Sequence, residues 1–327
     1  MTSILNNGIR IVPVHMHSVF SGRFFSLHSN LDENKFHSLT KNLNSDDVYI
    51  LDFESIKNTL VSDSVATGAA GLMDKKVMLT NLKSSTYKLF KSNFDKDLLD
   101  YKSTSKNKSL ITKQFPGDSV KLPDLTDFLY LTAYLKEECK KNLKAITVPK
   151  EISSNYYVNK FFDLSKMFGN MDTVKVAVYL MAKKMEELER KYKMLRYKLV
   201  SSSFNGSVLA NLVALIKMRK HISIPHLGPS IAVDDNRYMK YIKKHDKLVY
   251  IYDFIALGNE QKTVSIIAKL YNAEVICSLG LTDYKHYQQK DEKTSRTHSL
   301  VNFSEISKPF YAAAEREHVE RLMRTEK

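Results

Sequence analysis

Apolar residues occur at three different spacings along the chain, and each spacing predicts a different kind of structure. Over residues 1–100, short apolar runs such as Asp47–Phe53 are separated by polar stretches, which is typical of strands mixed with helices. Over residues 123–246, apolar residues recur every three or four positions, which predicts helices. Near residues 247–281, two apolar runs flank one amphipathic stretch, which predicts a β-α-β unit with parallel strands. The whole pattern predicts an α+β protein that is predominantly helical.

The same pattern predicts where the chain divides. We expect a mixed α/β region at 1–100 and an exposed basic loop or hinge at 101–122, where lysines and serines show no periodicity. A basic helical region should follow at 123–246. The β-α-β unit and a C-terminal helix should occupy 247–327.

The longest regular pattern predicts one helix over residues 172–199. Eight apolar residues there are spaced alternately by four and three positions, which is the spacing of a coiled-coil seam. They are Val174, Val178, Met181, Met185, Leu188, Tyr192, Leu195 and Leu199. Such a seam either packs inside its own helical region or pairs with a second copy of the chain, and the second case would make the protein an oligomer.

The positive charge is concentrated in the middle of the chain. The formal net charge is +14, but residues 1–100 and 248–327 each carry 11 basic and 11 acidic side chains, so the whole excess lies in 101–247. A focused positive field attracts polyanions such as nucleic acid. Lysines outnumber arginines 40 to 10, which favours contact with backbone phosphates over the reading of base edges.

A nucleic-acid interface is therefore expected on the basic middle region. Residues 235–246 are expected to form a basic helix in which the ring of Tyr241 stacks on a base. Further basic side chains lie on the long helix and at the end of the short apolar helix that follows it. The expected nucleic-acid-binding residues are Lys184, Lys191, Arg196, Lys198, Lys217, Arg219, Lys220, Arg237, Lys240, Tyr241, Lys243 and Lys244.

The sequence contains no motif that identifies a catalytic, cofactor or metal site. The turn of the β-α-β unit has a single glycine, Gly258, where nucleotide-binding motifs need several. Cys139 and Cys277 stand in no reactive-cysteine or zinc signature, and the ten histidines show no metal-ligand spacing. No catalytic residue, cofactor or metal ligand is therefore predicted.

These observations favour a sequence-independent nucleic-acid-binding protein that coats or packages single-stranded RNA in the manner of a viral nucleoprotein. RNA is the expected partner ahead of DNA, together with self-association. Two alternatives stay open: an oligomeric scaffold with a basic surface for acidic partners, and an enzyme whose site no motif reveals. Because the sequence shows neither a secretory signal nor a transmembrane segment, we expect a cytoplasmic protein without integral membrane contact.

Overall fold

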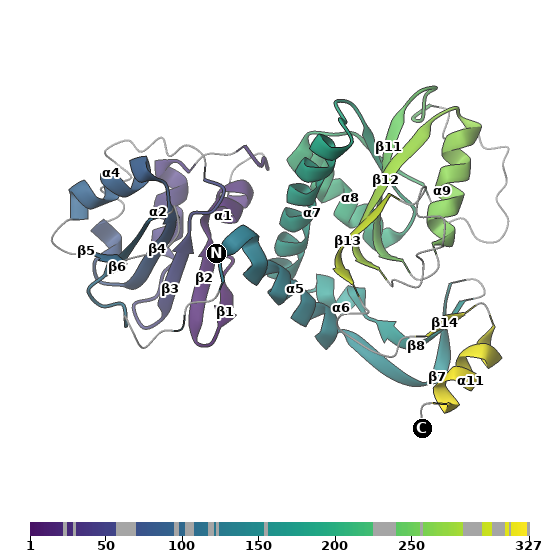
Figure 1. The fold of residues 1–327 in the computed structure, drawn as a ribbon, viewed down its shortest axis with the longest axis horizontal. Coiled ribbons are helices and arrows are strands. Elements are labelled where there is room, and N and C mark those ends of the chain that lie inside the picture. The colour runs from purple at the N-terminus through teal and green to yellow at the C-terminus, as the bar shows by residue number, and fades with distance from the viewer. Residues whose placement is uncertain are drawn as a thin grey trace. The chain divides into compact units, whose positions relative to one another are not determined.

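The chain forms two compact units, Met1–Tyr134 and Leu135–Lys327, in a computed structural model (Figure 1). The structure describes residues 1–21, 25–28, 31–56, 70–94, 98–101, 108–116, 121, 124–153, 156–224, 240–255, 258–283, 296–302, 311–313 and 315–325. Each unit has its own sheet and core, and we take them one at a time.

The first unit is built on a six-stranded sheet with the order β1-β2-β3-β4-β6-β5. The three central strands are parallel and the outer pairs are antiparallel. The strands are β1 (Ile4–Asn6), β2 (Ile9–Pro13), β3 (Val48–Asp52), β4 (Lys76–Leu82), β5 (Leu98–Tyr101) and β6 (Lys108–Thr112). The helices are α1 (Val14–Phe20), α2 (Glu33–Lys41), η1 (Ala70–Leu72), α4 (Ser84–Phe94) and η3 (Thr126–Phe128).

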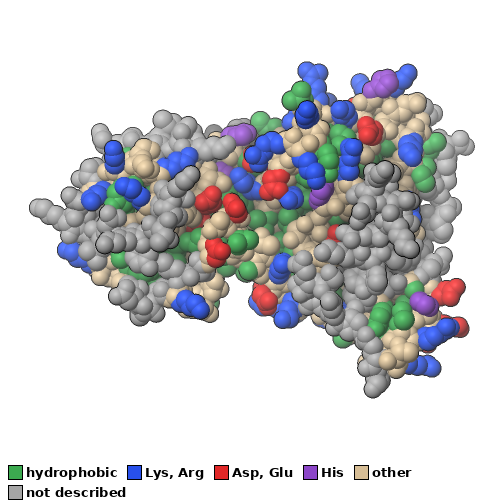
Figure 2. All heavy atoms as spheres, viewed as in Figure 1, with side chains coloured by type: hydrophobic (Ala, Val, Ile, Leu, Met, Phe, Trp, Pro, Cys, Tyr) green, Lys and Arg blue, Asp and Glu red, His purple; other side chains and the backbone are tan. Residues whose placement is uncertain are grey.

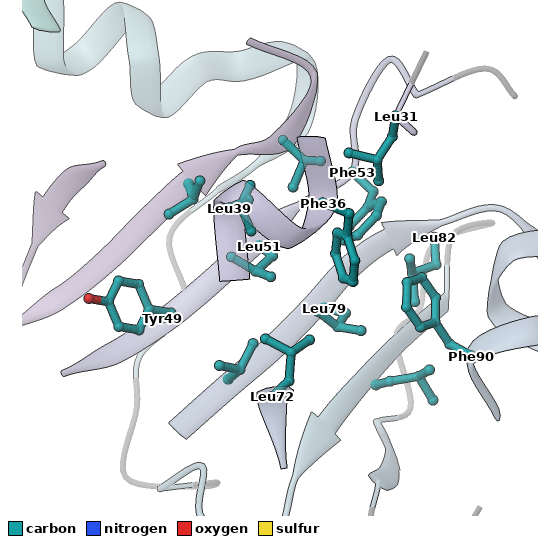
Figure 3. Close-up of a cluster of buried hydrophobic side chains, with 14 of the residues drawn as sticks. Leu31, Phe36, Leu39, Tyr49, Leu51, Phe53, Leu72, Leu79, Leu82 and Phe90 are labelled. Carbon is teal, nitrogen blue, oxygen red and sulfur yellow. The ribbon is translucent and has the colours of Figure 1, made fainter. Parts of the chain in front are cut away.

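The core of the first unit lies between this sheet and two helices, as Figure 3 shows. The ring of Phe90 on α4 lies 5.9 Å, centroid to centroid, from Phe36 on α2 and equally far from Phe53 beyond β3. Leucines 51 and 79 of the central strands are buried against the same cluster. Because α2 and α4 share one cluster, they cover the same face of the sheet.

One carboxylate is fully buried in the first unit. Asp52, the last residue of β3, accepts hydrogen bonds from Asn81 Nδ2 at 2.7 Å, from the Tyr130 hydroxyl at 2.8 Å and from the Glu54 amide at 3.0 Å. Burial raises the pKa of Asp52, and these donors oppose the rise. Since the donors are protein groups and the side chain has no exposed surface, Asp52 holds the structure together and meets no ligand.

The second unit contains a five-stranded sheet in which every strand is parallel to its neighbours. Its order is β10-β9-β11-β12-β13, with β9 (Lys198–Ser201), β10 (His221–Ser223), β11 (Lys247–Ile255), β12 (Glu274–Asp283) and β13 (Thr297–Asn302). Helices α7 (Met171–Lys191) and α8 (Phe204–Lys217) cover one face, and α9 (Asn259–Leu270) covers the other (Figure 1).

A smaller antiparallel sheet completes the second unit. It has the order β14-β8-β7, with β7 (Leu143–Ser153), β8 (Tyr156–Phe162) and β14 (Ala312–Ala313). Helices α6 (Leu164–Phe168) and α11 (Arg316–Arg324) belong to this unit, as does most of α5 (Leu129–Lys141), which begins in the first unit.

The prediction of a predominantly helical fold is wrong, because the protein is mixed α/β with two parallel sheet regions. The region 123–246, expected to be helical, contains β7, β8, β9 and β10. Tyr156–Phe162 is rich in aromatic and β-branched residues and pairs with β7. The chain between Tyr101 and Thr112, expected as loop, also contributes β6, because its apolar residues pair with β4 and β5.

The long helix is present but shorter than predicted. It runs over Met171–Lys191, and Met185 and Leu188 are buried as the seam requires. Leu195 continues the spacing but is 86% exposed, and Leu199 lies in strand β9. The predicted helix extends too far because Leu199, a buried residue of the short strand β9, falls at the next position of the four-and-three spacing.

The β-α-β unit predicted near 247–281 is present. Strands β11 and β12 are parallel and α9 connects them. Among the described residues, no helix has the length and apolar character needed to cross a membrane.

Candidate functional site

The order of strands in the parallel sheet reverses at β9. The chain passes from β9 through α8 to β10 on one side, and later continues from β11 through α9 to β12 on the other side. In open parallel sheets, ligands bind beyond the carboxyl ends of the strands at the place where the order reverses. The carboxyl ends of β9 and β11 are therefore the first place to look for a site.

A hydrogen-bonded group of three side chains lies at this place, on the face that α9 covers. Ser202 follows β9 directly, and its hydroxyl donates to Glu260 Oε2 at 2.9 Å. The same hydroxyl lies 2.8 Å from the Tyr250 hydroxyl, which donates to Glu260 at 3.3 Å. Burial raises the pKa of Tyr250, and the charge of Glu260 raises it further, so Tyr250 stays protonated as a donor.

A second carboxylate, Asp253, lies on β11 and points to the opposite face of the sheet, because residues 250 and 253 are an odd number of positions apart. Its Oδ1 accepts a hydrogen bond from the Ser203 hydroxyl at 2.9 Å. Asp253 is half-buried. Burial raises its pKa, the Ser203 hydrogen bond lowers it, and the nearby charge of Glu260 raises it again.

The charge of Glu260 acts on Asp253, so the two carboxylates lie near each other although Asp253 points to the other face of the sheet. Serine hydroxyls donate a hydrogen bond to each of them. Burial and the neighbouring charge of Glu260 both raise the pKa of Asp253. A carboxyl group whose pKa is raised by burial and by a specific neighbouring charge is a candidate functional group.

Two helices begin at the same edge. Ser203 caps α8, with its hydroxyl accepting from the Gly206 amide at 3.0 Å. A Cβ at Gly206 would lie 2.6 Å from that hydroxyl oxygen, so a larger residue would displace the Ser203 side chain from its capping position. Helix α9 begins at Gly258, whose φ of 72° is the left-handed conformation that glycine adopts freely, and no side chain caps it.

Neighbouring residues complete the edge. Thr282, at the end of β12, donates its hydroxyl to the Asp253 carbonyl oxygen at 3.0 Å. Ser201 turns toward α8, where its hydroxyl lies 2.7 Å from His221 Nε2 and 2.8 Å from the Ser207 hydroxyl. Ser201 has no exposed surface, so it supports the site from behind and does not meet a ligand.

The arrangement offers hydrogen-bond acceptors and the positive ends of two helices at one edge. Carboxylates accept hydrogen bonds from hydroxyl groups, as acidic side chains do from ribose in dinucleotide sites. Helix N-termini favour phosphate groups. In the part of the chain that the structure describes, no group of three or more metal-ligating side chains comes together.

The residues predicted from the sequence to bind nucleic acid do not meet at this edge. Several of them are engaged within the protein: Lys217 and Arg219 form ion pairs with Glu189, and Lys198 forms one with Asp246. On α7, Lys184 pairs with Glu187 at 2.6 Å, and Lys191 lies over the Tyr192 ring. Arg196 and Lys220 are exposed.

The basic helix expected at 235–246 is not seen over its described part. Arg237 lies outside the described residues. Lys240, Tyr241 and Lys244 lie in turns, and Lys243 lies in the irregular chain between them. Tyr241 is exposed, with Lys240 Nζ 5.8 Å from the centre of its ring, and the Lys243 amide donates to Asp246 at 2.7 Å. Asp246 thus ends this segment with a turn and does not continue it as a helix.

The fold resembles solved enzymes over about half of this chain. Adenine phosphoribosyltransferase from Trypanosoma brucei, solved with AMP, pyrophosphate and ribose 5-phosphate, is 12% identical; the match covers 57% of this chain and 85% of that one, with a TM-score of 0.41. Orotate phosphoribosyltransferase from Mycobacterium tuberculosis is 14% identical over 54% and 98%, with a TM-score of 0.38. The Aeropyrum pernix orotate enzyme is 15% identical over 53% and 96%, with a TM-score of 0.40.

Comparisons by sequence give no match, neither to a family model nor to a curated protein. The comparisons contradict the prediction of an RNA-coating protein of viral nucleoprotein type with nucleic acid as its partner: the similar solved structures are adenine and orotate phosphoribosyltransferases. The alternative of an enzyme without a visible motif fits these findings better.

The charge argument failed for a physical reason. The net charge of a segment does not show which side chains share a surface, and in the folded protein several of the basic residues it pointed to are held in ion pairs with Glu189 and Asp246. The residues that form the site were missed because they are far apart in sequence, 58 positions in the case of Ser202 and Glu260. Two signals were available: Asp253 inside the apolar run 247–255, and three serines directly after an apolar strand.

Proposed function

We propose that the protein is an enzyme that acts on a small phosphorylated sugar at the carboxyl edge of its parallel sheet. The observation that carries this proposal is the pair Asp253 and Glu260, each held by a serine hydroxyl where the strand order reverses. Burial raises the pKa of Asp253, and a buried carboxyl group with a charged neighbour is a candidate for binding or catalysis.

Each part of the edge has a task in this proposal. Asp253 and Glu260 accept hydrogen bonds from neighbouring hydroxyl groups of the sugar. The uncapped start of α9 at Gly258 receives the phosphate group, since helix N-termini attract anions. The serines keep both carboxylates in position, so that little reorganisation is needed when the ligand arrives.

The reaction that suits this edge is transfer at the anomeric carbon of the sugar. As the bond from that carbon to the leaving group breaks, positive charge develops on the ring until a bond to the acceptor forms. Two carboxylates in a partly dehydrated site stabilise that charge more in the transition state than in the bound substrate. Asp253 and Glu260 act here by their charge and their hydrogen bonds.

Binding of ribose 5-phosphate, measured by titration calorimetry, tests the proposal. We expect saturable binding that is weaker for 2-deoxyribose 5-phosphate, because one hydroxyl for the carboxylates is then missing, and much weaker for ribose, which lacks the phosphate. Release of the free base from nucleoside monophosphates in the presence of pyrophosphate then tests turnover.

Two variants that each remove one negative charge test where ribose 5-phosphate binds. Glu260→Gln removes a charge at the site, whereas Glu274→Gln removes one from an exposed residue at the other end of β12. We expect only the first to weaken ribose 5-phosphate binding, by about tenfold or more. Equal affinity for ribose 5-phosphate and its deoxy analogue, or no effect of Glu260→Gln, contradicts the assignment of the carboxylates to sugar hydroxyls.

The enzyme is expected to work in the cytoplasm. Cys139 and Cys277 are both buried free thiols, which suits a reducing compartment. Burial raises the pKa of each to about 12, so neither thiol serves as a nucleophile near neutral pH.

A further inference from the structure

A second cluster of polar side chains lies in the second unit, where the end of α7 meets the start of β13. Lys191 and Tyr192 lie at the end of α7, Arg296 directly precedes β13, and His298 is the second residue of that strand. We call these four residues the Tyr192 cluster. The first residues of β13 pair with Ser278 and Leu279, in the middle of β12.

The ring of Tyr192 is the centre of this cluster. Lys191 Nζ lies 5.3 Å from the centre of the ring, and the guanidinium carbon of Arg296 lies 5.1 Å from it. Both distances end at the same ring, so the two charges are at most about 10 Å apart. The Tyr192 hydroxyl lies 3.0 Å from His298 Nε2, which adds the imidazole to the group.

Within the described residues, the two cations of the cluster have no carboxylate partner, unlike several other basic residues of this unit. Lys198, Lys217 and Arg219 each form an ion pair. Over the described ranges, no Asp or Glu oxygen lies within 4.0 Å of a side-chain nitrogen of Lys191 or Arg296. The nearby Lys184 adds a third positive charge, partly compensated by Glu187.

The pKa values of neighbouring groups show that these charges converge. Lys191 and Lys184 lower the pKa of His298 beyond the effect of burial, while Glu187 opposes them. Arg296 and Lys191 both act on Cys277, where they oppose the effect of burial on the thiol. Lys191 therefore lies close both to the imidazole of His298 and to Cys277 on β12.

Local structure explains only part of this arrangement. A lysine in the last turn of α7 is favoured by the negative end of the helix, and a cation over an aromatic ring gains some energy. Arg296 belongs to no helix. Neither effect explains why its guanidinium group lies over the same Tyr192 ring as Lys191. Two close positive charges without a counter-charge repel each other, and an anion between them would remove that repulsion.

The cluster is also open to solvent. Lys191 and Arg296 are exposed, and Tyr192 and His298 are half-buried. On the face drawn in Figure 2, lysine and arginine side chains gather over α7. A ligand can reach these cations without any change in the fold.

We propose that the Tyr192 cluster is a second binding site, specific for the phosphate group of a small ligand. Arg296 provides a planar fork that binds two oxygens of a tetrahedral oxyanion at once. Lys191 provides a point charge, and the imidazole of His298, at 3.0 Å from the Tyr192 hydroxyl, is near enough to respond to a bound anion. None of the four residues belongs to the hydrogen-bonded group of Ser202, Tyr250 and Glu260 or contacts Asp253 in the described part of the chain.

Titration of the full chain with inorganic phosphate tests this proposal. The readout is the imidazole NMR signal of His298, identified by its loss in His298→Gln. We expect the signal to shift and then to saturate as phosphate is added. Arg296→Gln should weaken the affinity by about tenfold or more, because it removes a charged hydrogen-bond donor.

Control variants separate this site from net charge and from the proposed active site. Lys220→Gln removes the same charge from an exposed residue outside the cluster, and Asp253→Asn alters only the carboxyl edge. We expect neither to change the titration of His298. Arg296→Lys keeps the charge but loses the planar guanidinium group, so it should bind phosphate with intermediate affinity. It also shows whether a loss of binding in Arg296→Gln comes from a failure to fold.

Two results would overturn the proposal. One is a His298 signal that phosphate does not move. The other is an equal loss of affinity in Arg296→Gln and Lys220→Gln, which would show that only the overall charge attracts the ion.

Discussion

At the scale of single residues, Asp253 illustrates how a carboxylate proposed to bind the substrate opposes the stability of its fold. Burial raises its pKa above the ordinary value of 3.8, so the folded protein binds a proton there more readily than the unfolded chain does. Its contribution to stability is therefore complete at acid pH and is lost as the pH rises through the raised pKa.

Asp253→Asn removes this cost while keeping the size of the side chain. We expect the variant to unfold at an equal or higher denaturant concentration than the wild type at pH 7, with the difference shrinking toward pH 4. Ribose 5-phosphate binding should weaken in the same variant. A variant that is clearly less stable than the wild type at pH 7 would show that Asp253 serves the fold.

The packing of the Tyr252 ring leaves room only for glycine at position 280. A Cβ at this position would lie 1.8 Å from Tyr252 Cε2, inside the space of the ring that crosses the strand. The ring is held there because its hydroxyl donates to the His298 carbonyl oxygen at 2.8 Å.

We expect Gly280→Ala to lower the free energy of unfolding by about 1–3 kcal/mol, as overpacking of a close-packed core does. Urea denaturation followed by circular dichroism measures the change. Gly71→Ala is the matched control, because a Cβ there meets nothing within 4 Å. Adding Tyr252→Leu should recover part of the loss, and a purely additive double variant would place the strain elsewhere.

At the scale of elements, the end of α7 is tied to β9 and α8 through Glu189. Its Oε2 lies 2.9 Å from Lys217 Nζ, and its Oε1 accepts from the Tyr197 hydroxyl at 2.6 Å. The Lys217 side chain is only 8% exposed, so its charge depends on this one carboxylate. Arg219, over the Tyr197 ring, adds a longer contact of 3.7 Å.

Glu189→Gln should therefore cost about 2–3 kcal/mol of unfolding free energy, because it leaves a lysine charge buried without its partner. Glu187→Gln, two residues earlier on the same helix, breaks the more exposed pair with Lys184 and should change stability by less than about 0.5 kcal/mol. The denaturant midpoints of both variants test this prediction. Similar losses of unfolding free energy in the two variants would mean that the burial of Lys217 is unimportant.

The sequence predicted some elements better than others, for reasons that particular residues show. The β-α-β unit was recognisable because two apolar runs of strand length flank a clearly amphipathic helix. Strand β9 has four residues and continues the spacing of α7 by chance through Leu199, so no local pattern distinguishes it. Strand β8 was hidden because its partner β7 sets its structure, and pairing between strands is not a local property.

The candidate site was predictable only in part. Asp253 inside an apolar strand was a visible anomaly, and Gly258 was correctly placed at the turn of the β-α-β unit. The meeting of Ser202 with Glu260 depends on the order of strands in the sheet, which spacing along the chain does not encode.

At the scale of the whole molecule, the two units have separate cores and should unfold separately. One cluster of buried apolar residues lies entirely within Met1–Tyr134 and another entirely within Leu135–Lys327. We expect calorimetry of the full chain to resolve two transitions, of which Gly280→Ala lowers only one.

Ribose 5-phosphate should raise the temperature of that same transition and leave the other unchanged. At one hundred times its dissociation constant, a ligand adds about 2.7 kcal/mol to the stability of the part that binds it. A single transition that moves as a whole with ligand would contradict the independence of the units.

The reversal of strand order at β9 also determines when, during translation, the chain can form its proposed ligand-binding edge. Both neighbours of β9, namely β10 and β11, follow it in the chain, so a ribosome releases β9 before either partner exists. Glu260 emerges 58 residues after Ser202, which takes about 3–12 s at the usual rates of translation. Until β10 and β11 have emerged, the nascent chain exposes β9 as an unpaired apolar strand, and the proposed ligand-binding edge is completed only after Glu260 has left the ribosome.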